Sequence, residues 1–249
     1  PLIKGPEDVS KVKAFDVAGA ERTVQRIASV HRMGEEFGET HSVLGWVEGP
    51  LAEYSDLRGV ETALMDLMDK PEMYMGAAER IVDNAIAFAR AQIEAGADMI
   101  GVGDAAASLI APDMFRQFVL PFEKKLFDAI HEAGATVKLH ICGNISRIIG
   151  EMAKTGADII DVDWMVPLDA AREAVGPDVA LAGNFDPAGV LLQGSPEDVA
   201  EAARKCLADG GERFILQPGC EVPQATPEEN IRAFCPCEGC LIQKELNLN

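Results

Sequence analysis

The feature that most constrains the fold of this chain is a regular alternation of short apolar runs with longer amphipathic stretches. The apolar runs have the length of strands, and each is followed by sequence with helical periodicity. Strict alternation of this kind implies a parallel sheet connected by right-handed crossovers. We expect strands at residues 42–47, 98–102, 136–141, 158–162, 179–182 and 214–217.

Glycines and prolines mark the ends of the helices between these strands. Gly38, Gly96 and Gly134 each follow an amphipathic stretch, as glycines that end helices do. Ser195 and Pro196 suit an N-cap and a first turn. We expect helices at residues 20–37, 59–68, 72–95, 112–133, 145–154, 167–175, 195–208 and 227–234.

Two α/β architectures fit six parallel strands. A doubly wound sheet is one, and a (β/α)8 barrel, of which six strands would leave two missing, is the other. A dinucleotide fingerprint would favour the first, but Gly101-Val102-Gly103 lacks a third glycine and does not open a helix. The pattern of strands and helices leaves both open.

Length and charge narrow the class of protein. The 249 residues suit a single domain, which we place at residues 1–234, followed by a cysteine-containing tail at 235–249. The net charge of −19 disfavours nucleic acid as a partner. We find no apolar run long enough to span a membrane. Free cysteines in a large α/β chain favour a reducing cytoplasm.

The strongest chemical signal lies at the carboxyl ends of two expected strands. His140 and Cys142 are two residues apart, so they point to the same side of a strand, and Cys220 ends another strand. An imidazole and two thiolates are good ligands for Zn²⁺, and three protein ligands leave a position open for catalysis. The other reading is a core histidine with two small buried thiols.

Several polar residues lie at or just after the same strand ends. Carboxylates there could supply a fourth zinc ligand or orient His140, or they could be capping and solvated groups. Asn184 and Asp186 are candidates for shaping the pocket, and Trp164 for its wall. The candidate carboxylates are Glu48, Asp104, Asp163 and Glu221. In the tail, Cys235, Cys237 and Cys240 are too few for a typical iron–sulfur site, so we expect a redox-labile tail.

Four segments together resemble the uroporphyrinogen decarboxylase superfamily, and within it the zinc-dependent methylcorrinoid:coenzyme M methyltransferases. They are LHICGN (139–144), DVDW (161–164), AGNFDP (182–187) and QPGCEVPQATPEENIRA (217–233). The resemblance implies a (β/α)8 barrel, with zinc on His140, Cys142 and Cys220. It further implies that a small thiol such as coenzyme M takes a methyl group from a methylated corrinoid on a partner protein.

The resemblance also defines what this chain lacks. The family carries a further segment with the first two barrel strands before the part that matches Pro1–Val17. Either that segment precedes Pro1, or another element completes the barrel, as in a homo-oligomer formed by domain exchange. Two alternatives therefore stand beside the methyltransferase: a decarboxylase of the same family, and a non-catalytic scaffold that keeps the zinc site.

Overall fold

The computed structural model describes residues 1–234, which form two compact units. Unit 1 comprises residues 1–142 and 147–160, and unit 2 comprises, among the described residues, 143–146 and 161–234. Six strands follow one another in the sheet in sequence order, so the predicted number and sequence of strands are confirmed. The single domain predicted over 1–234 stays a prediction. Cys235, Cys237 and Cys240 lie outside the described residues.

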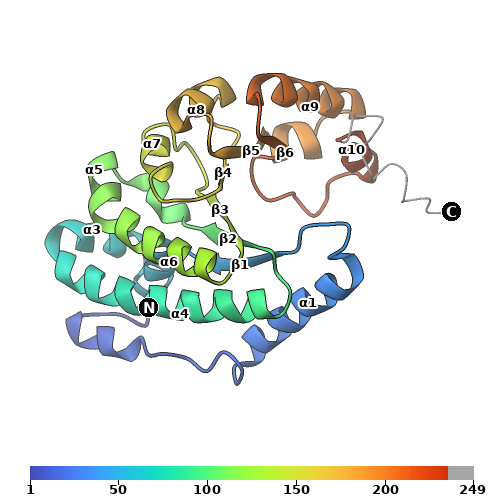
Figure 1. Ribbon diagram of the computed structural model, residues 1–249. Coiled ribbons are helices and arrows are strands. Elements are labelled where there is room, and N and C mark those ends of the chain that lie inside the picture. The colour runs from blue at the N-terminus through green and yellow to red at the C-terminus, as the bar shows by residue number, and fades with distance from the viewer. Residues whose placement is uncertain (235–249) are drawn as a thin grey trace. The chain divides into compact units, whose positions relative to one another are not determined.

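Unit 1 carries the amino-terminal strands and the long helices that cover them (Figure 1). Its strands are β1 (Leu44–Glu48), β2 (Met99–Gly103) and β3 (Thr136–His140), and β4 (Ile159–Asp161) lies at the boundary with unit 2. Its α-helices are α1 (Glu21–Phe37), α2 (Pro50–Arg58), α3 (Val60–Asp69), α4 (Pro71–Glu94), α5 (Pro112–Met114), α6 (Leu120–Glu132) and α7 (Ile149–Met152). Shorter turns are η1 (Pro6–Lys11), η2 (Ala105–Leu109) and the π-helical η3 (Phe115–Val119).

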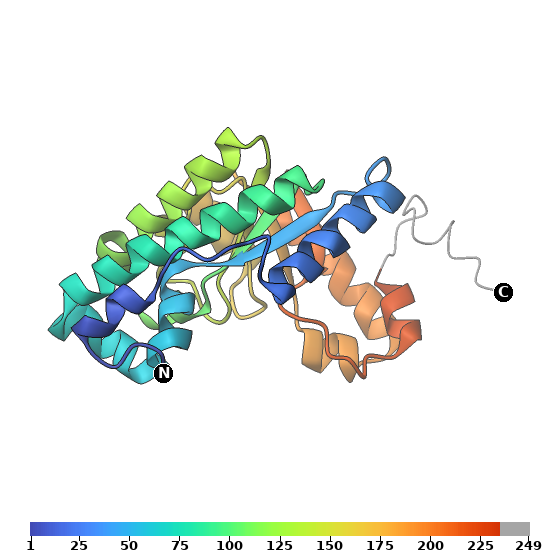
Figure 2. The same ribbon diagram turned by 90° about the horizontal axis from the view of Figure 1, so that it is seen from below.

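The core of unit 1 lies between the sheet and helices α4 and α6, which run side by side (Figures 1 and 2). Alternate strand residues such as Val47, Val102 and Leu139 are fully or almost fully buried, as expected for the helix-covered face of a sheet. Tyr74 contacts Tyr54 edge to face, with ring centroids 5.1 Å apart. Such aromatic pairs add specific geometry to the apolar burial.

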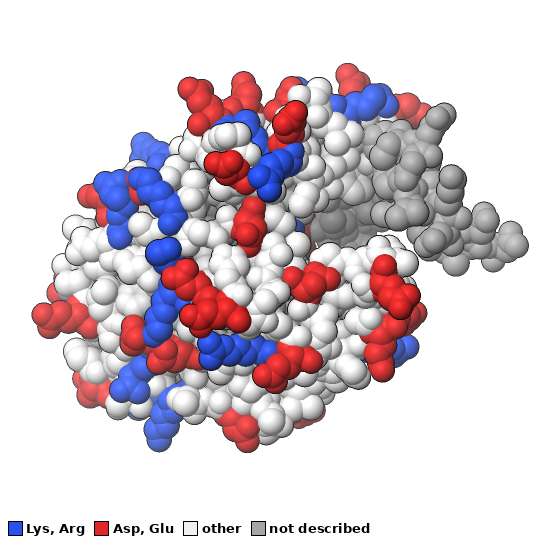
Figure 3. Space-filling view, viewed as in Figure 1, with Lys and Arg blue, Asp and Glu red and all other residues white. Residues whose placement is uncertain are grey.

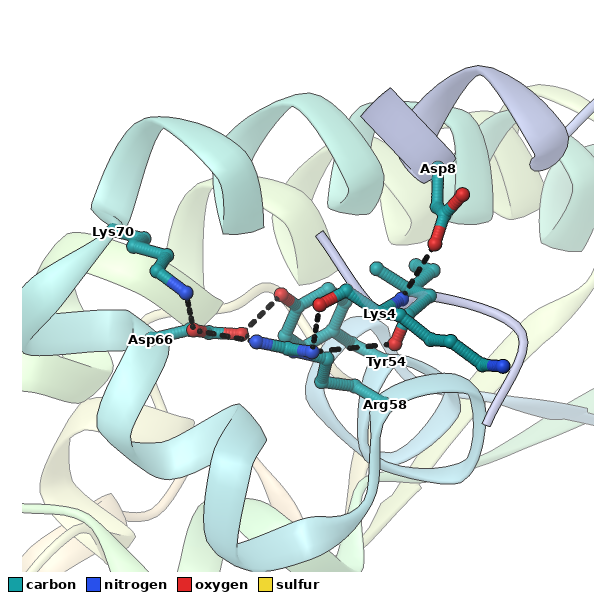
Figure 4. Close-up of polar contacts among 7 residues, drawn as sticks. Lys4, Asp8, Tyr54, Arg58, Asp66 and Lys70 are labelled. Carbon is teal, nitrogen blue, oxygen red and sulfur yellow. Dashed lines mark hydrogen bonds and ion pairs between the residues drawn. The ribbon is translucent and has the colours of Figure 1, made fainter. Parts of the chain in front are cut away.

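A buried ion pair links α2, α3 and the amino-terminal segment (Figure 4). The Arg58 guanidinium donates to Asp66 Oδ2 at 2.6 Å and to the carbonyl of Lys4 at 2.8 Å. The Tyr54 hydroxyl donates to the same carboxylate at 2.8 Å. These contacts hold residues 3–4, which make no regular structure of their own, against the helices.

Unit 2 repeats the strand–helix pattern on a smaller scale. Its strands β5 (Ala180–Phe185) and β6 (Phe214–Pro218) pair in parallel, and helix α9 (Pro196–Gly210) packs on both. The predicted N-cap Ser195 is confirmed, since it forms a capping box with Asp198. The other helical elements are α8 (Leu168–Val175), α10 (Glu228–Ala233) and the π-helical η4 (Pro187–Leu192).

The main departures from the predicted elements are local. A helix at Pro50–Arg58 was not predicted, and the expected helix at 145–154 covers only Ile149–Met152. The expected helix at 112–133 is interrupted by η3 ahead of Pro121, and β5 continues beyond 182 to Phe185. Within the described residues, no helix combines the length and the apolar character that crossing a membrane requires.

Candidate functional site

One face of the sheet in unit 1 carries polar side chains instead of the apolar ones on the helix-covered face. Glu48 of β1, Gly103 of β2 and His140 of β3 share one row at the carboxyl ends of their strands. Residues in register on parallel strands point to the same face. The row before it holds Trp46, Gly101 and Lys138. The carboxyl ends of the strands, where sites of parallel α/β folds lie, are therefore polar here.

The two glycines of β2 make room for the Trp46 ring. A Cβ atom at Gly101 would lie 2.3 Å from Trp46 Cε3, and one at Gly103 would lie 2.7 Å from Trp46 Cζ2. The indole N–H donates to Glu48 Oε1 at 3.0 Å. The Gly-Val-Gly segment thus serves the packing of an aromatic side chain.

His140 and Cys142 lie next to each other at the carboxyl end of β3. His140 is the last residue of β3 and is 9% exposed, and its Nε2 lies 3.0 Å from Cys142 Sγ. The next residue, Gly143, has a φ of +88°, a conformation that favours glycine. An imidazole nitrogen and a half-buried thiol therefore face each other directly after a strand.

Asp104 follows β2 directly but turns its carboxylate toward α2. Its oxygens accept hydrogen bonds from the backbone N–H of Ala52 at 2.6 Å and of Leu51 at 3.3 Å. Burial raises the pKa of this carboxyl to about 7, against the lowering effect of the two backbone hydrogen bonds and with a further rise from the charge of Glu48. Asp104 thus caps the first turn of α2 from outside that helix.

Unit 2 contains a second polar cluster, built on Asp163 and Asn184. Both side chains are buried, at 4% and 9% exposure. The Asp163 carboxylate accepts from the N–H of Gly143 at 2.8 Å and from that of Met165 at 3.2 Å. The Asn184 amide donates to the carbonyl of Val166 at 2.6 Å. These bonds fix the loop that follows β4 and carries the half-exposed Trp164.

Cys220 lies in the same unit, two residues after β6, and its thiol is half-buried. The preceding Gly219 is tightly packed, since a Cβ atom there would lie 2.5 Å from the backbone nitrogen of Trp164. The loop that carries Cys220 therefore packs closely against the loop after β4. Glu221 is exposed. Asp186 instead caps η4, accepting from the N–H groups of Ala188 and Gly189 at 2.8 and 2.9 Å.

The predicted site residues come from both units. His140 and Cys142 belong to unit 1, and Asp163, Asn184 and Cys220 belong to unit 2. Asp104 and Asp186 cap helical elements. Sequence reasoning did not single out Lys138, although a lysine in a buried strand, two residues before His140, is a signal for the polar face. It also missed Trp46, whose partners are glycines more than 50 positions away in the sequence.

Comparison with known proteins shows which family this chain is similar to. A family model described as uroporphyrinogen decarboxylase (URO-D) matches residues 1–237. The methylcobamide:CoM methyltransferase MtbA of Methanosarcina acetivorans is 32% identical over 238 residues, 95% of this chain and 69% of the relative. A uroporphyrinogen decarboxylase of Nocardia farcinica is 30% identical over 232 residues, 88% of this chain and 65% of that protein.

A solved structure agrees with these relatives. A methyltransferase from Methanosarcina mazei superposes with a TM-score of 0.79 at 28% identity, covering 89% of this chain and 68% of that chain. The α/β-barrel type of fold is therefore confirmed. The relatives named methyltransferases also confirm the prediction of an enzyme of that class. The chain spans about two thirds of the length of the relatives it matches.

Proposed function

Because the chain belongs to the uroporphyrinogen decarboxylase family, we propose that it transfers a methyl group from a methylated corrinoid to a small thiol bound at a zinc site. The paired imidazole and thiol of His140 and Cys142 are the observation that carries this proposal, since their donor atoms lie 3.0 Å apart. The relative MtbA is named a methylcobamide:CoM methyltransferase, which supports a corrinoid donor and coenzyme M as acceptor. The corrinoid is carried by a partner protein in this proposal.

The donor set fits zinc. His140, Cys142 and Cys220 form a group of described residues that could hold one metal ion. One neutral imidazole and two thiolates are soft and borderline ligands of the kind that zinc takes in proteins, and three of them leave one position for a substrate. The proposal includes the arrangement of the two units that brings Cys220 to the pair in unit 1.

A zinc ion held there would lower the pKa of the acceptor thiol, so that a thiolate forms near neutral pH. In the transfer, the thiolate sulfur forms a bond to the methyl carbon while the carbon–cobalt bond breaks, and the bonding electron pair stays on cobalt. The chain's own residues position the acceptor. In this proposal the row formed by Glu48, Gly103 and His140 gives one wall of the acceptor pocket.

The buried cluster of unit 2 has a supporting role in this proposal. Asp163 and Asn184 fix the loop after β4 through backbone hydrogen bonds. We assign them to shaping the pocket for corrinoid or acceptor, together with the exposed carboxylate of Glu221. Asp104 and Asp186 use their carboxylates on backbone N–H groups, so we assign them to holding α2 and η4 in place. A cytoplasmic location follows from the need for reduced thiols.

Two other functions compete with this one. A decarboxylase is favoured by the family description and by the relative from Nocardia farcinica, but it gives no role to the His140–Cys142 pair. The second alternative is a scaffold that binds zinc without turnover. Metal content separates the first alternative from our proposal, and turnover separates the second.

The test combines metal analysis with a transfer assay. We expect the purified chain to bind one zinc per molecule, and to consume methylcobalamin in the presence of coenzyme M. A Cys220→Ala variant loses a ligand, so we expect a loss of at least about tenfold in zinc affinity or activity, as for lost ligands and their supporting contacts. Cobalt substitution adds a spectroscopic readout, because thiolate ligands give intense charge-transfer bands.

The matched control is Cys206→Ala, which removes a buried free thiol from helix α9 of the same unit. We expect it to keep its zinc and its thiolate-to-cobalt bands. Equal zinc content in Cys220→Ala and the wild type would contradict the ligand assignment. Full zinc binding without any methyl transfer would leave the scaffold as the better description.

A further inference from the structure

One buried side chain ties the segment after Cys220 to the rest of unit 2. Asn230 of α10 is 1% exposed, and its amide nitrogen donates to the carbonyl of Leu191 at 2.9 Å and to that of Gly194 at 2.8 Å. These carbonyls lie near the carboxyl end of η4, where a helix leaves its last carbonyls without partners of its own. Asn230 therefore closes the end of η4 from another element.

The Asn230 amide acts through its nitrogen. Among the described residues, the buried Asn230 Oδ1 has no hydrogen-bond partner. A buried amide oxygen without a partner costs free energy, so packing alone does not account for an asparagine at this position. An ionised aspartate has the same shape but no donor, so it could not replace the two bonds.

The chain on both sides of Cys220 is held by the end of one strand. β5 ends at Phe185, whose carbonyl accepts from the N–H of Gly219 at 2.9 Å. The Phe185 ring contacts Phe234, the residue after α10, with ring centroids 5.2 Å apart. Cys220 therefore lies on a loop that leaves the end of β5 and returns to it.

The part of this loop between Cys220 and α10 is stiff. It contains Pro223 and Pro227, whose rings fix their own φ angles. The Thr226 N–H donates to the Pro223 carbonyl at 3.0 Å and closes a turn. A stiff loop passes a shift of α10 on to Cys220 instead of absorbing it.

We propose that Asn230 is a positioning residue, which fixes α10 on η4 and thereby holds the Cys220 thiol in the position of a zinc ligand. The inference rests on the proposed function for the role of Cys220. Asn230 acts through the loop, and its loss would leave the carbonyls of Leu191 and Gly194 without their donor.

Alkylation of the zinc-free chain tests the position of Cys220 by itself. Mass spectrometry of the peptides gives the rate at which iodoacetamide modifies Cys220, and that rate depends on the exposure of the thiol. We expect Asn230→Ala and Asn230→Asp to raise it at least about tenfold, because two buried hydrogen bonds are lost. The control Leu181→Ala removes a fully buried side chain near the opposite end of β5 from Phe185. The same rate in all four chains, or the same rise in the control, would overturn the proposal.

Zinc titration separates this inference from the proposed function. We expect Asn230→Ala to bind zinc about tenfold more weakly than the wild type and Leu181→Ala, the lower end of the range for residues that support a metal ligand. Wild-type affinity in folded Asn230→Ala would overturn the positioning role. A wild type that binds no zinc would end the proposed function, and the alkylation rates would still decide on Asn230.

If neither Asn230 variant folds, the wild type decides in urea below its unfolding transition. Amide hydrogen exchange of α10 and alkylation of Cys220 should rise together with the urea concentration, because both report the release of α10. Alkylation of Cys220 that does not follow the exchange of α10 would overturn the proposal.

Discussion

At the scale of single residues, glycines determine where the side chains of the candidate site can lie. Gly101 and Gly103 admit the Trp46 ring, and Gly219 lets the loop of Cys220 approach the loop after β4. Gly101 has ordinary strand geometry, so its role is purely spatial. A side chain there would overlap the indole, because strand neighbours are in direct contact.

We therefore expect Gly101→Ala to destabilise the chain by about 1–3 kcal/mol, the usual range for overpacking a filled site. The added Cβ would lie 2.3 Å from the Trp46 ring, so the indole must move and its bond to Glu48 must weaken. Urea unfolding gives the free energy, and near-ultraviolet circular dichroism reports the tryptophan environment. Gly150→Ala is the control, because a Cβ atom at Gly150 meets nothing within 4 Å. Equal midpoints for the two variants would refute the spatial role.

At the scale of elements, the buried contact between α2 and α3 makes the free energy of unfolding depend on pH. Burial alone raises the pKa of Asp66, but hydrogen bonds from Arg58 and Tyr54 outweigh it and hold the pKa below its ordinary value of 3.8. A carboxyl whose pKa is lower in the folded state stabilises the fold above its unfolded pKa. That contribution is lost as the pH falls through the lower folded value. The stabilisation by Asp66 is therefore lost as the pH falls below about 4.

Asp66→Asn leaves the Arg58 charge buried without its partner, so we expect a loss of about 3 kcal/mol at pH 7. Its unfolding free energy should also depend less on pH than that of the wild type below about pH 4. Denaturant unfolding at a series of pH values measures both effects. Asp128→Asn, in an exposed pair with Lys124, should stay within about 0.5 kcal/mol of the wild type. Parallel pH curves for Asp66→Asn and the wild type would contradict the assignment.

Helices and strands could be predicted where the residues that define them lie close together in the sequence. The alternation of apolar runs and amphipathic stretches predicted all six strands, and Ser195 correctly marked the start of α9. Helix α2 was missed, and the residue that caps it is distant in the sequence. Its cap, Asp104, comes from the end of β2, 53 residues later than Leu51. The expected helix at 145–154 begins late because the Asn144 side chain accepts from the Ser146 N–H, a local turn that competes with the helix.

At the scale of the whole molecule, the sequence predicted which residue types could bind a metal, but not the role of each carboxylate in the candidate site. The spacing of His140 and Cys142 implies one face of a strand, and the structure places their donor atoms 3.0 Å apart. The roles of Asp104 and Asp186 were not predictable, because a carboxylate after a strand can serve a ligand or a helix end equally well. For Asp104 a contact with a distant segment, the bond from Ala52, decides between those roles, whereas for Asp186 the local bond from Ala188 does.

The proposed zinc site makes a prediction that involves both units at once. Unit 1 supplies His140 and Cys142, and unit 2 supplies Cys220. An ion that binds only the folded chain raises its stability, by about 2.7 kcal/mol when free zinc is at 100 times its dissociation constant. We expect zinc to raise the melting temperature of the wild type, and a chelator to reverse the effect. Cys220→Ala should show a much smaller rise than Cys206→Ala, because two ligands from one unit hold the ion weakly. An equal rise in both variants would mean that unit 1 binds the metal alone, and Cys220 would then have no part in the site.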